Sequence, residues 1–167
     1  MTTILGIAAA MALAIGAAFA TAPRDAFETG IFIAAPPKQV WNLLTDPSEH
    51  VRWNPAMRSI EGRFAVGEHP SLTMETGSGR PVTFRPEILI ANPGAELRWR
   101  GRLGLPRLFD GEHYFLLFAE DGGTRLVHGE RFHGLLLWFV DVQQFRPGFE
   151  AANEGLKARA EEQASAG

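Results

Sequence analysis

Two histidines and one glutamate are the residues whose types and spacing best suit chemistry at a shared site. They lie on two β-rich segments, 111–119 and 124–132, on either side of Asp121-Gly122-Gly123, which is typical of a hairpin turn. If a four-residue loop joins the segments, counting back from it fixes which residues face each other. The predicted pairs are Ala119 with Thr124, Leu117 with Leu126, Phe115 with His128, and His113 with Glu130. The apolar members predict that both histidines and the glutamate lie on the buried face of a sheet.

The sequence leaves four interpretations of these three residues open. A buried carboxylate needs a hydrogen-bond donor, so the first is a satisfied polar pair that fixes the strand register. The second is recognition of a carbonyl, hydroxyl or carboxylate group on an apolar ligand. The third is general acid–base catalysis by His113 or His128, with Glu130 orienting the ring. The fourth is a metal site, but its ligands must converge, whereas the histidines are diagonal neighbours about 7 Å apart. We expect no metal and no cofactor.

Aromatic side chains supply most of the other candidates for a ligand-binding wall. They are equally typical of a packed core, and both interpretations stay open. With the three polar residues, the predicted ligand-binding set is Trp53, Phe84, Trp99, His113, Phe115, His128, Glu130, Phe132 and Trp138. Trp138 belongs to the apolar run 135–140, whose residues cannot all face inward on one helix. The run predicts either buried packing or a lid or membrane-facing lip at the entrance to the site.

Changes in the hydrophobic period indicate the elements that position these residues. Residues 21–28 predict a short linker, and residues 29–34 a strand that Pro36-Pro37 ends. Residues 37–45 and 47–53 predict two short helices. From residue 59 the period changes to two, which predicts strands at 59–64, 71–75, 82–90, 97–103, 111–119 and 124–132. The tail predicts a long helix that starts or kinks at Pro147-Gly148.

The order of these elements predicts an α+β fold of one domain. A seven-stranded curved antiparallel sheet surrounds a long C-terminal helix, in the order β-α-α-β6-α. A sheet with one apolar face must bury that face, and the last helix is the only predicted element long enough to cover it. A strongly twisted sheet that curls around one helix leaves a space that side chains need not fill. That space is the predicted ligand site.

Several short motifs spread over residues 27–162 carry a family resemblance. They are Ile33–Pro36, Val40–Asp46, Trp53–Pro55, Phe109–Phe115, Gly123–Phe132, Gly148-Phe149 and Asn153–Lys157. In these motifs the chain resembles the helix-grip (START-like) superfamily. That superfamily includes START lipid-transfer domains, the birch-pollen allergen, a family of carbon-monoxide dehydrogenase subunits and the polyketide cyclase/dehydrase families. The resemblance implies an elongated, mostly apolar cavity for a lipid, a polyketide or another hydrophobic molecule. It transfers no catalytic residue, because members differ at those positions.

Residues 1–22 carry no charged side chain and form a segment separate from the domain at 23–167. As a helix, the apolar run 4–22 would span about 28 Å, close to the hydrocarbon thickness of a bilayer. It predicts one N-terminal membrane anchor, or a secretory signal cleaved after Ala20 that leaves a periplasmic or secreted protein. A soluble N-terminal helix is the third possibility. We expect the first two to direct the chain to a membrane.

Composition excludes several classes of function. The chain has 16 basic and 19 acidic residues, a balance that offers no electrostatic footprint for nucleic acid. The absence of cysteine excludes disulfides, thiolate zinc sites and cysteine nucleophiles. The sequence has no phosphate-binding loop, dinucleotide glycine motif or HExxH motif. The alternating Arg98, Arg100 and Arg102 predict either a solvated outer face or a docking surface for anionic lipid headgroups.

Together these observations predict a membrane-targeted domain that binds a hydrophobic small molecule or lipid between the sheet and the last helix, with no assigned catalysis. The first alternative is an enzyme of the polyketide cyclase/dehydrase kind. In it, His113, His128 or Glu130 would act on a proton α to a carbonyl. The second alternative is a protein-interaction module whose interior is filled by its own side chains.

Overall fold

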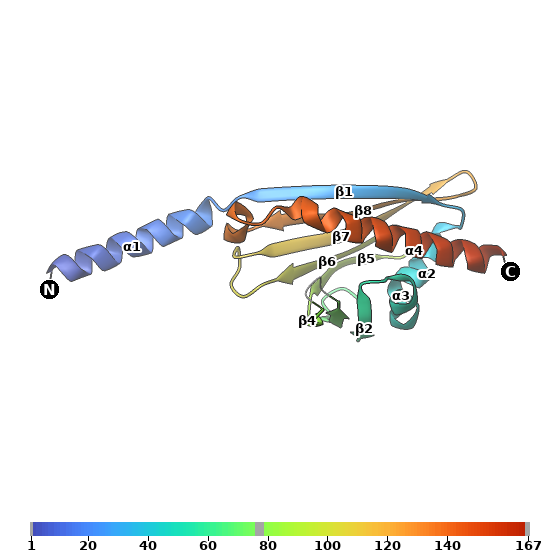
Figure 1. The fold of residues 1–167 in the computed structure, drawn as a ribbon, viewed down its shortest axis with the longest axis horizontal. Helices are drawn as coiled ribbons and strands as arrows, with labels where there is room; N and C mark the ends of the chain where they lie inside the picture. The colour runs from blue at the N-terminus through green and yellow to red at the C-terminus, as the bar shows by residue number, and fades with distance from the viewer. Residues whose placement is uncertain (1, 76–78, 166–167) are drawn as a thin grey trace.

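The computed structural model describes residues 2–75 and 79–165, which form an N-terminal helix and an α+β domain (Figure 1). The helices are α1 (Thr2–Ala20), α2 (Pro37–Thr45), α3 (Pro47–Trp53) and α4 (Arg146–Ser165), with two 3-10 helices, η1 (Leu135–Trp138) and η2 (Val142–Phe145). The strands are β1 (Arg24–Ile33), β2 (Met57–Glu61), β3 (Ser71–Met74), β4 (Val82–Phe84), β5 (Glu87–Asn92), β6 (Glu96–Arg102), β7 (Asp110–Glu120) and β8 (Gly123–His133). Helix α4 runs along the sheet beside β1, and α1 extends away from the domain (Figure 1).

The strands form two antiparallel sheets, not the single seven-stranded sheet that the sequence predicts. The larger has the order β1-β8-β7-β6-β5, and the smaller has the order β2-β3-β4. The predicted strand at 82–90 is divided at Pro86, which has no N–H to give to a ladder. Strand β4 therefore pairs in the small sheet, whereas β5 pairs with β6 in the large one. The predicted α+β class, with a curved antiparallel sheet and a long C-terminal helix, is confirmed.

The register of the β7–β8 hairpin confirms the pairing predicted from its turn. Ala119 faces Thr124, Phe115 faces His128, and His113 faces Glu130. The same inward and outward alternation continues into β1, which pairs with β8 along its whole length from Arg24 to Ile33. Residues 24–28, predicted as a linker, are therefore strand. Both histidines and the glutamate therefore lie on the same face of β7 and β8, and β1 extends this face on the other side of β8.

The core lies between the larger sheet, the small sheet and the three helices of the domain. Pro37 occupies the first turn of α2, and the Asp46 carboxylate caps α3 by accepting hydrogen bonds from the amides of Ser48 and Glu49. Helix α4 buries the small residues Ala152 and Ala160 together with Leu156. These residues make close packing possible, and α4 lies so near the carbonyl of Trp53 that a Cβ at Gly155 would overlap it. Helix α4 thus packs closely on α3 and also contacts β1 and β8 of the larger sheet.

Helix α1 coincides with the predicted N-terminal segment. Among the residues that the structure describes, no helix is both long enough and apolar enough to cross a membrane. The membrane anchor and cleavage after Ala20 both stay predictions.

Candidate functional site

His113 and His128 lie at the centre of a buried chain of polar side chains that joins the sheet to α4. The Nε2 atoms of the two histidines are 2.8 Å apart, and Nδ1 of His128 is 2.7 Å from Oδ1 of Asn153. Asn153 donates from Nδ2 to Oγ1 of Thr29 at 2.8 Å, and this hydroxyl donates to the carbonyl of His128 at 3.0 Å. At the other end, Nδ1 of His113 is 3.5 Å from Oε2 of Glu130. Strands β1, β7 and β8 and helix α4 thus each contribute to one continuous polar chain.

The direction of every hydrogen bond in this chain follows from its end at Thr29. The Thr29 hydroxyl gives its proton to a carbonyl, so it accepts from Asn153, whose Oδ1 consequently faces His128 and accepts. A neutral His128 must then carry its proton on Nδ1 and leave Nε2 bare. His113 therefore donates from Nε2, and its own Nδ1 is the bare nitrogen that faces Glu130. Glu130 lies at the end of this chain, and its Oε2 contacts the bare nitrogen at 3.5 Å without forming a hydrogen bond.

Burial favours the uncharged form of His113, His128 and Glu130. It lowers the pKa of His113 to about 3 and holds the pKa of His128 well below its ordinary value, where the neighbouring His113 acts in the same direction. Burial also raises the pKa of Glu130 to about 8. Near neutral pH the carboxyl therefore keeps its proton while the imidazoles are uncharged. The pair His113–Glu130 is a neutral contact and not a salt bridge.

Aromatic rings enclose the two histidines. Trp99 stacks on His113 with a centroid distance of 4.4 Å, and Phe115 stacks on His128 at 4.1 Å. Phe149 of α4 covers both imidazoles, at 4.8 Å from His113 and 4.3 Å from His128. These rings exclude water from the hydrogen bonds, which accounts for the pKa directions.

Glu130 differs from the histidines because one side of its carboxyl faces a gap in the inner face. The residue opposite Phe132 on β7 is Gly111, and a Cβ there would overlap Oε1 of Glu130. Gly111 in turn pairs with Gly101 of β6, where an added Cβ would meet open space. The Glu130 carboxyl itself fills the space that Gly111 leaves, and the facing Gly101 leaves open space next to it. The Glu130 side chain is 20% exposed. We name this opening, formed by Gly101, Gly111 and Glu130, the glycine gap.

The remaining predicted site residues fall into three positions. Trp53, Trp99, Phe115 and Phe132 are buried, Phe84 lies in the small sheet at the edge of the main core, and Trp138 is 56% exposed on η1. The structure thus brings Trp99 and Phe115 to the histidines but places Trp138 outside the interior. Within the apolar run 135–140, Leu137 packs against a smaller core cluster, while Trp138 and Phe139 are exposed. The buried members of that cluster are Phe27, Phe132 and Val142.

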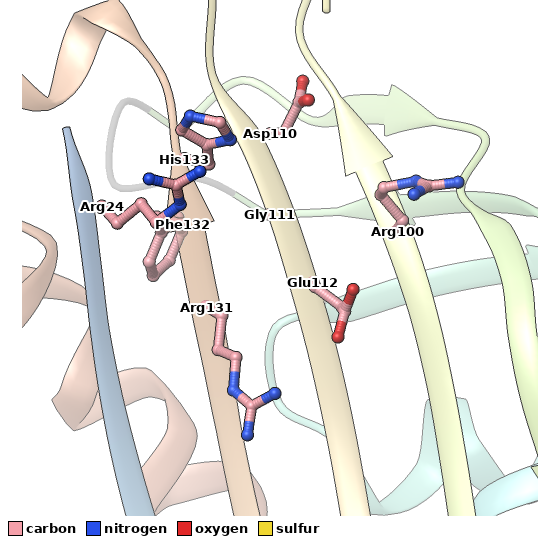
Figure 2. A pocket seen from close by; sticks show the side chains of 8 residues that line it. All are labelled: Arg24, Arg100, Asp110, Gly111, Glu112, Arg131, Phe132 and His133. Atoms are coloured by element: carbon pink, nitrogen blue, oxygen red, sulfur yellow. The ribbon is translucent and has the colours of Figure 1, made fainter. Parts of the chain in front are cut away.

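The predicted space between sheet and helix is filled by rings where the histidines lie. The two described pockets are elsewhere, on the outer face of the sheet, with volumes of about 320 and 120 Å³. The larger opens near the ends of β1, β7 and β8 and is lined by charged side chains (Figure 2). Among the described residues, no three His, Asp or Glu side chains are placed to hold a metal ion. An apolar ligand at the histidines would require the rings to move.

Two functional partners, Asn153 and Thr29, were not predicted from the sequence. Asn153 interrupts the apolar face of α4 between Ala152 and Leu156. A polar residue within a buried apolar stripe needs a hydrogen-bond partner, and this pattern could have identified Asn153 from the sequence. Thr29 sits at a β-rich position and gives no such signal. A third histidine, His50 of α3, is also buried: its Nδ1 lies 3.0 Å from the Leu44 carbonyl, and burial lowers its pKa to about 4.

Comparison with known proteins assigns the domain to a family. Residues 24–161 match the family model described as polyketide cyclase / dehydrase and lipid transport. The chain belongs to this family. A search of curated proteins finds no significant match.

Solved structures share the fold at low sequence identity. Protein CV1439 from Chromobacterium violaceum is 19% identical, with a TM-score of 0.69 over 81% of this chain and 96% of its own. Ara h 8.0201 is 16% identical, with a TM-score of 0.64 over 87% of this chain and 100% of its own. The di-domain ARO/CYC StfQ of the steffimycin biosynthetic pathway is 15% identical, with a TM-score of 0.68 over 85% of this chain and 52% of its own. At these identities the likeness shows the fold alone.

Proposed function

We propose that this polyketide cyclase/dehydrase and lipid transport family member binds an apolar small molecule or lipid whose polar end enters the glycine gap. The observation that carries the proposal is the Glu130 carboxyl, which lies beside open space and makes no hydrogen bond within the described part of the chain. A protonated carboxyl is a hydrogen-bond donor, and an unpaired buried donor is costly. A ligand carbonyl, hydroxyl or ether oxygen in the gap would accept that proton.

The surroundings of the gap suit the apolar body of such a ligand. Trp99 and Phe132 flank the two glycines on the inner face, one on β6 and one on β8. Ligand sites of this kind combine an apolar wall with few polar groups that orient the molecule. The ring stack over the histidines then forms the floor of the site, and its side chains must shift to admit a longer molecule.

Filling the gap with a side chain tests the proposal. We expect wild-type protein to bind the neutral apolar fluorophore 1-N-phenylnaphthylamine, and Gly101→Leu to lose most of that binding while its circular dichroism is unchanged. Phe139→Ser is the matched control, because it removes an exposed apolar ring away from the gap and should leave probe binding intact. Native mass spectrometry of the purified wild type should also show a lipid-sized adduct that Gly101→Leu lacks. Equal probe binding by Gly101→Leu and wild type would overturn the proposal.

Acid–base catalysis is a second candidate function, favoured by the pKa of Glu130 near 8 beside an ordered histidine pair. A carboxyl that exchanges its proton close to neutral pH suits general acid or base work on a carbonyl compound. The match to a family model described as polyketide cyclase / dehydrase and lipid transport supports this candidate. Cyclisation of a poly-β-keto substrate, lost in Glu130→Gln, would support it; product formation that survives this substitution would exclude Glu130.

A further inference from the structure

One end of the domain presents four large apolar side chains to solvent. Leu103 and Leu105, in the loop between β6 and β7, are 58% and 66% exposed, and Trp138 and Phe139, at the end of η1, are 56% and 83% exposed. Backbone hydrogen bonds join the two segments, from Leu135 N to the carbonyl of Arg107 and from Leu136 N to that of Leu108. We name the four residues the apolar tip. Exposed apolar side chains gathered at one end of a domain indicate an interaction surface.

Helix α1 leaves the domain at this same end. The amide of Gly134, just before η1, donates to the carbonyl of Pro23 at 3.1 Å, and Arg107 Nη1 lies 3.5 Å from the carbonyl of Phe19. Figure 1 shows α1 projecting from the domain, and its side chains Ile7, Met11 and Leu13 are 61%, 61% and 76% exposed. The exposed apolar surface therefore continues from the tip onto α1.

Unpaired positive charge adjoins the apolar tip. Arg24 and Arg131 line the outer-face pocket of about 320 Å³ (Figure 2) and make no ion pair within residues 2–75 and 79–165. The two acidic residues of the pocket are already partnered: Asp110 by Arg102 at 3.8 Å, and Glu112 by Arg98 at 2.7 Å. Arg98 also pairs with Glu96, but three arginines and two acidic residues line the pocket, so its net charge is positive.

We propose that the apolar tip docks on the surface of an anionic phospholipid bilayer, with Arg24 and Arg131 contacting lipid phosphates. A bilayer interface supplies an apolar phase and a layer of negative phosphate side by side, in the arrangement that the tip and the pocket match. Docking requires no helix to cross the membrane, because α1 and the tip lie in the interface. This proposal is independent of the glycine gap.

The absence of cysteine makes the test direct. Phe139→Cys, Leu105→Cys and Phe118→Cys are each labelled with an environment-sensitive nitrobenzoxadiazole probe. Phe118 is the matched control, since it is 41% exposed near the β7–β8 turn, at the opposite end of β7. With phosphatidylglycerol-containing vesicles, we expect the probes at 139 and 105 to brighten and shift to the blue, and the probe at 118 to stay unchanged.

Charge is tested separately in the unlabelled full chain. Arg24→Gln and Arg131→Gln should each weaken binding to the phosphatidylglycerol vesicles by about fivefold, as expected for one arginine near an anionic surface. Arg125→Gln removes the same charge at the far end of the sheet, where it pairs with Glu120, and should leave binding unchanged.

Four results would overturn the proposal. The first is a chain that does not float with the vesicles, and the second is equal binding to pure phosphatidylcholine vesicles. The third is flotation with no change in the probes at 139 and 105, which would leave the tip outside the lipid. The fourth is a probe change at 139 without vesicles, accompanied by a concentration-dependent rise in mass, which would identify a second copy of the chain as the occupant.

Discussion

The neutral polar chain makes the stability of the domain depend on pH in two opposite directions. The pKa of Glu130 rises on folding from 4.5 to about 8, so its contribution is fully present at low pH and is lost as pH rises through 8. The pKa values of His50, His113 and His128 fall on folding from 6.5, so their contributions are present above pH 6.5 and are lost as pH falls. The free energy of unfolding should therefore peak between these windows, near pH 6.5 to 7.

Each pH unit over which one proton differs between the folded and unfolded chain is worth about 1.4 kcal/mol. From pH 6.5 to 8 the titration of Glu130 costs about 1.7 kcal/mol. The three histidines are still half protonated in the unfolded chain at pH 6.5, and their titration returns about 1.2 kcal/mol, so the net loss is about 0.5 kcal/mol. From pH 6.5 to 5.5 the three histidines oppose Glu130, and the balance is a loss of about 2 kcal/mol. Of these four groups only Glu130 lowers the stability as pH rises, so its removal should turn the small net loss into a gain of about 1.2 kcal/mol.

Glu130→Gln is the decisive variant, because an amide keeps the size of the side chain and a donor toward His113 but has no proton to lose. Urea unfolding, followed by tryptophan fluorescence at pH 5.5, 6.5 and 8, should show a small fall from pH 6.5 to 8 in the wild type and a rise of about 1.2 kcal/mol in Glu130→Gln. Glu150→Gln, which removes an exposed carboxyl of α4, should retain the fall. If the stability of Glu130→Gln changes from pH 6.5 to 8 by the same amount as that of the wild type, the assignment of a buried neutral carboxyl is refuted.

Two further substitutions probe how α4 holds the site. Asn153→Ala leaves the buried Nδ1 proton of His128 unpaired and should lower the free energy of unfolding by about 2–3 kcal/mol; a loss below about 0.5 kcal/mol in urea would contradict the polar chain. Gly155→Ala places a methyl group on the carbonyl of Trp53 and should destabilise by about 1–3 kcal/mol. Gly148→Ala meets nothing within 4 Å and should be neutral or stabilising by up to about 1 kcal/mol, so equal thermal melting of the two alanine variants would show that α3 and α4 do not pack this closely.

Local signals in the sequence predicted most of the elements. The helices at 37–45 and 47–53 have the predicted ends because proline and Asp46 act within one turn of chain. The hairpin register was predictable for the same reason, since a turn fixes the pairing on both sides of it. Residues 24–28 could not be recognised as strand, because their polar side chains face outward and only pairing with β8 at the far end of the chain holds them.

The site itself was predictable only in part. The strand alternation placed His113, His128 and Glu130 on one face, and the register then set their order. Their protonation could not be deduced, because it depends on Asn153, which reaches the histidines from a helix 25 residues further along the chain. The sequence also could not predict that aromatic rings fill the interior. An aromatic side chain has the same sequence pattern whether it lines a cavity or fills it.

The direction of the polar chain restricts what the glycine gap can accept. Reversing the chain would require the Thr29 hydroxyl to leave the carbonyl of His128, so the nitrogen of His113 that faces Glu130 is bare and gives the carboxyl no proton. Below its pKa of about 8 this carboxyl is protonated and can donate a hydrogen bond. A ligand in the gap must therefore have an oxygen that accepts it. A cation would meet no negative charge there, and an ionised carboxylate would have to give up its hydration in an apolar site. The ligand proposed for the gap is therefore a neutral oxygen-bearing molecule. Gly101 and Gly111 lie near the ends of β6 and β7 that lead into the loop bearing the apolar tip, so a docked domain would present the gap close to the lipid from which such a molecule partitions.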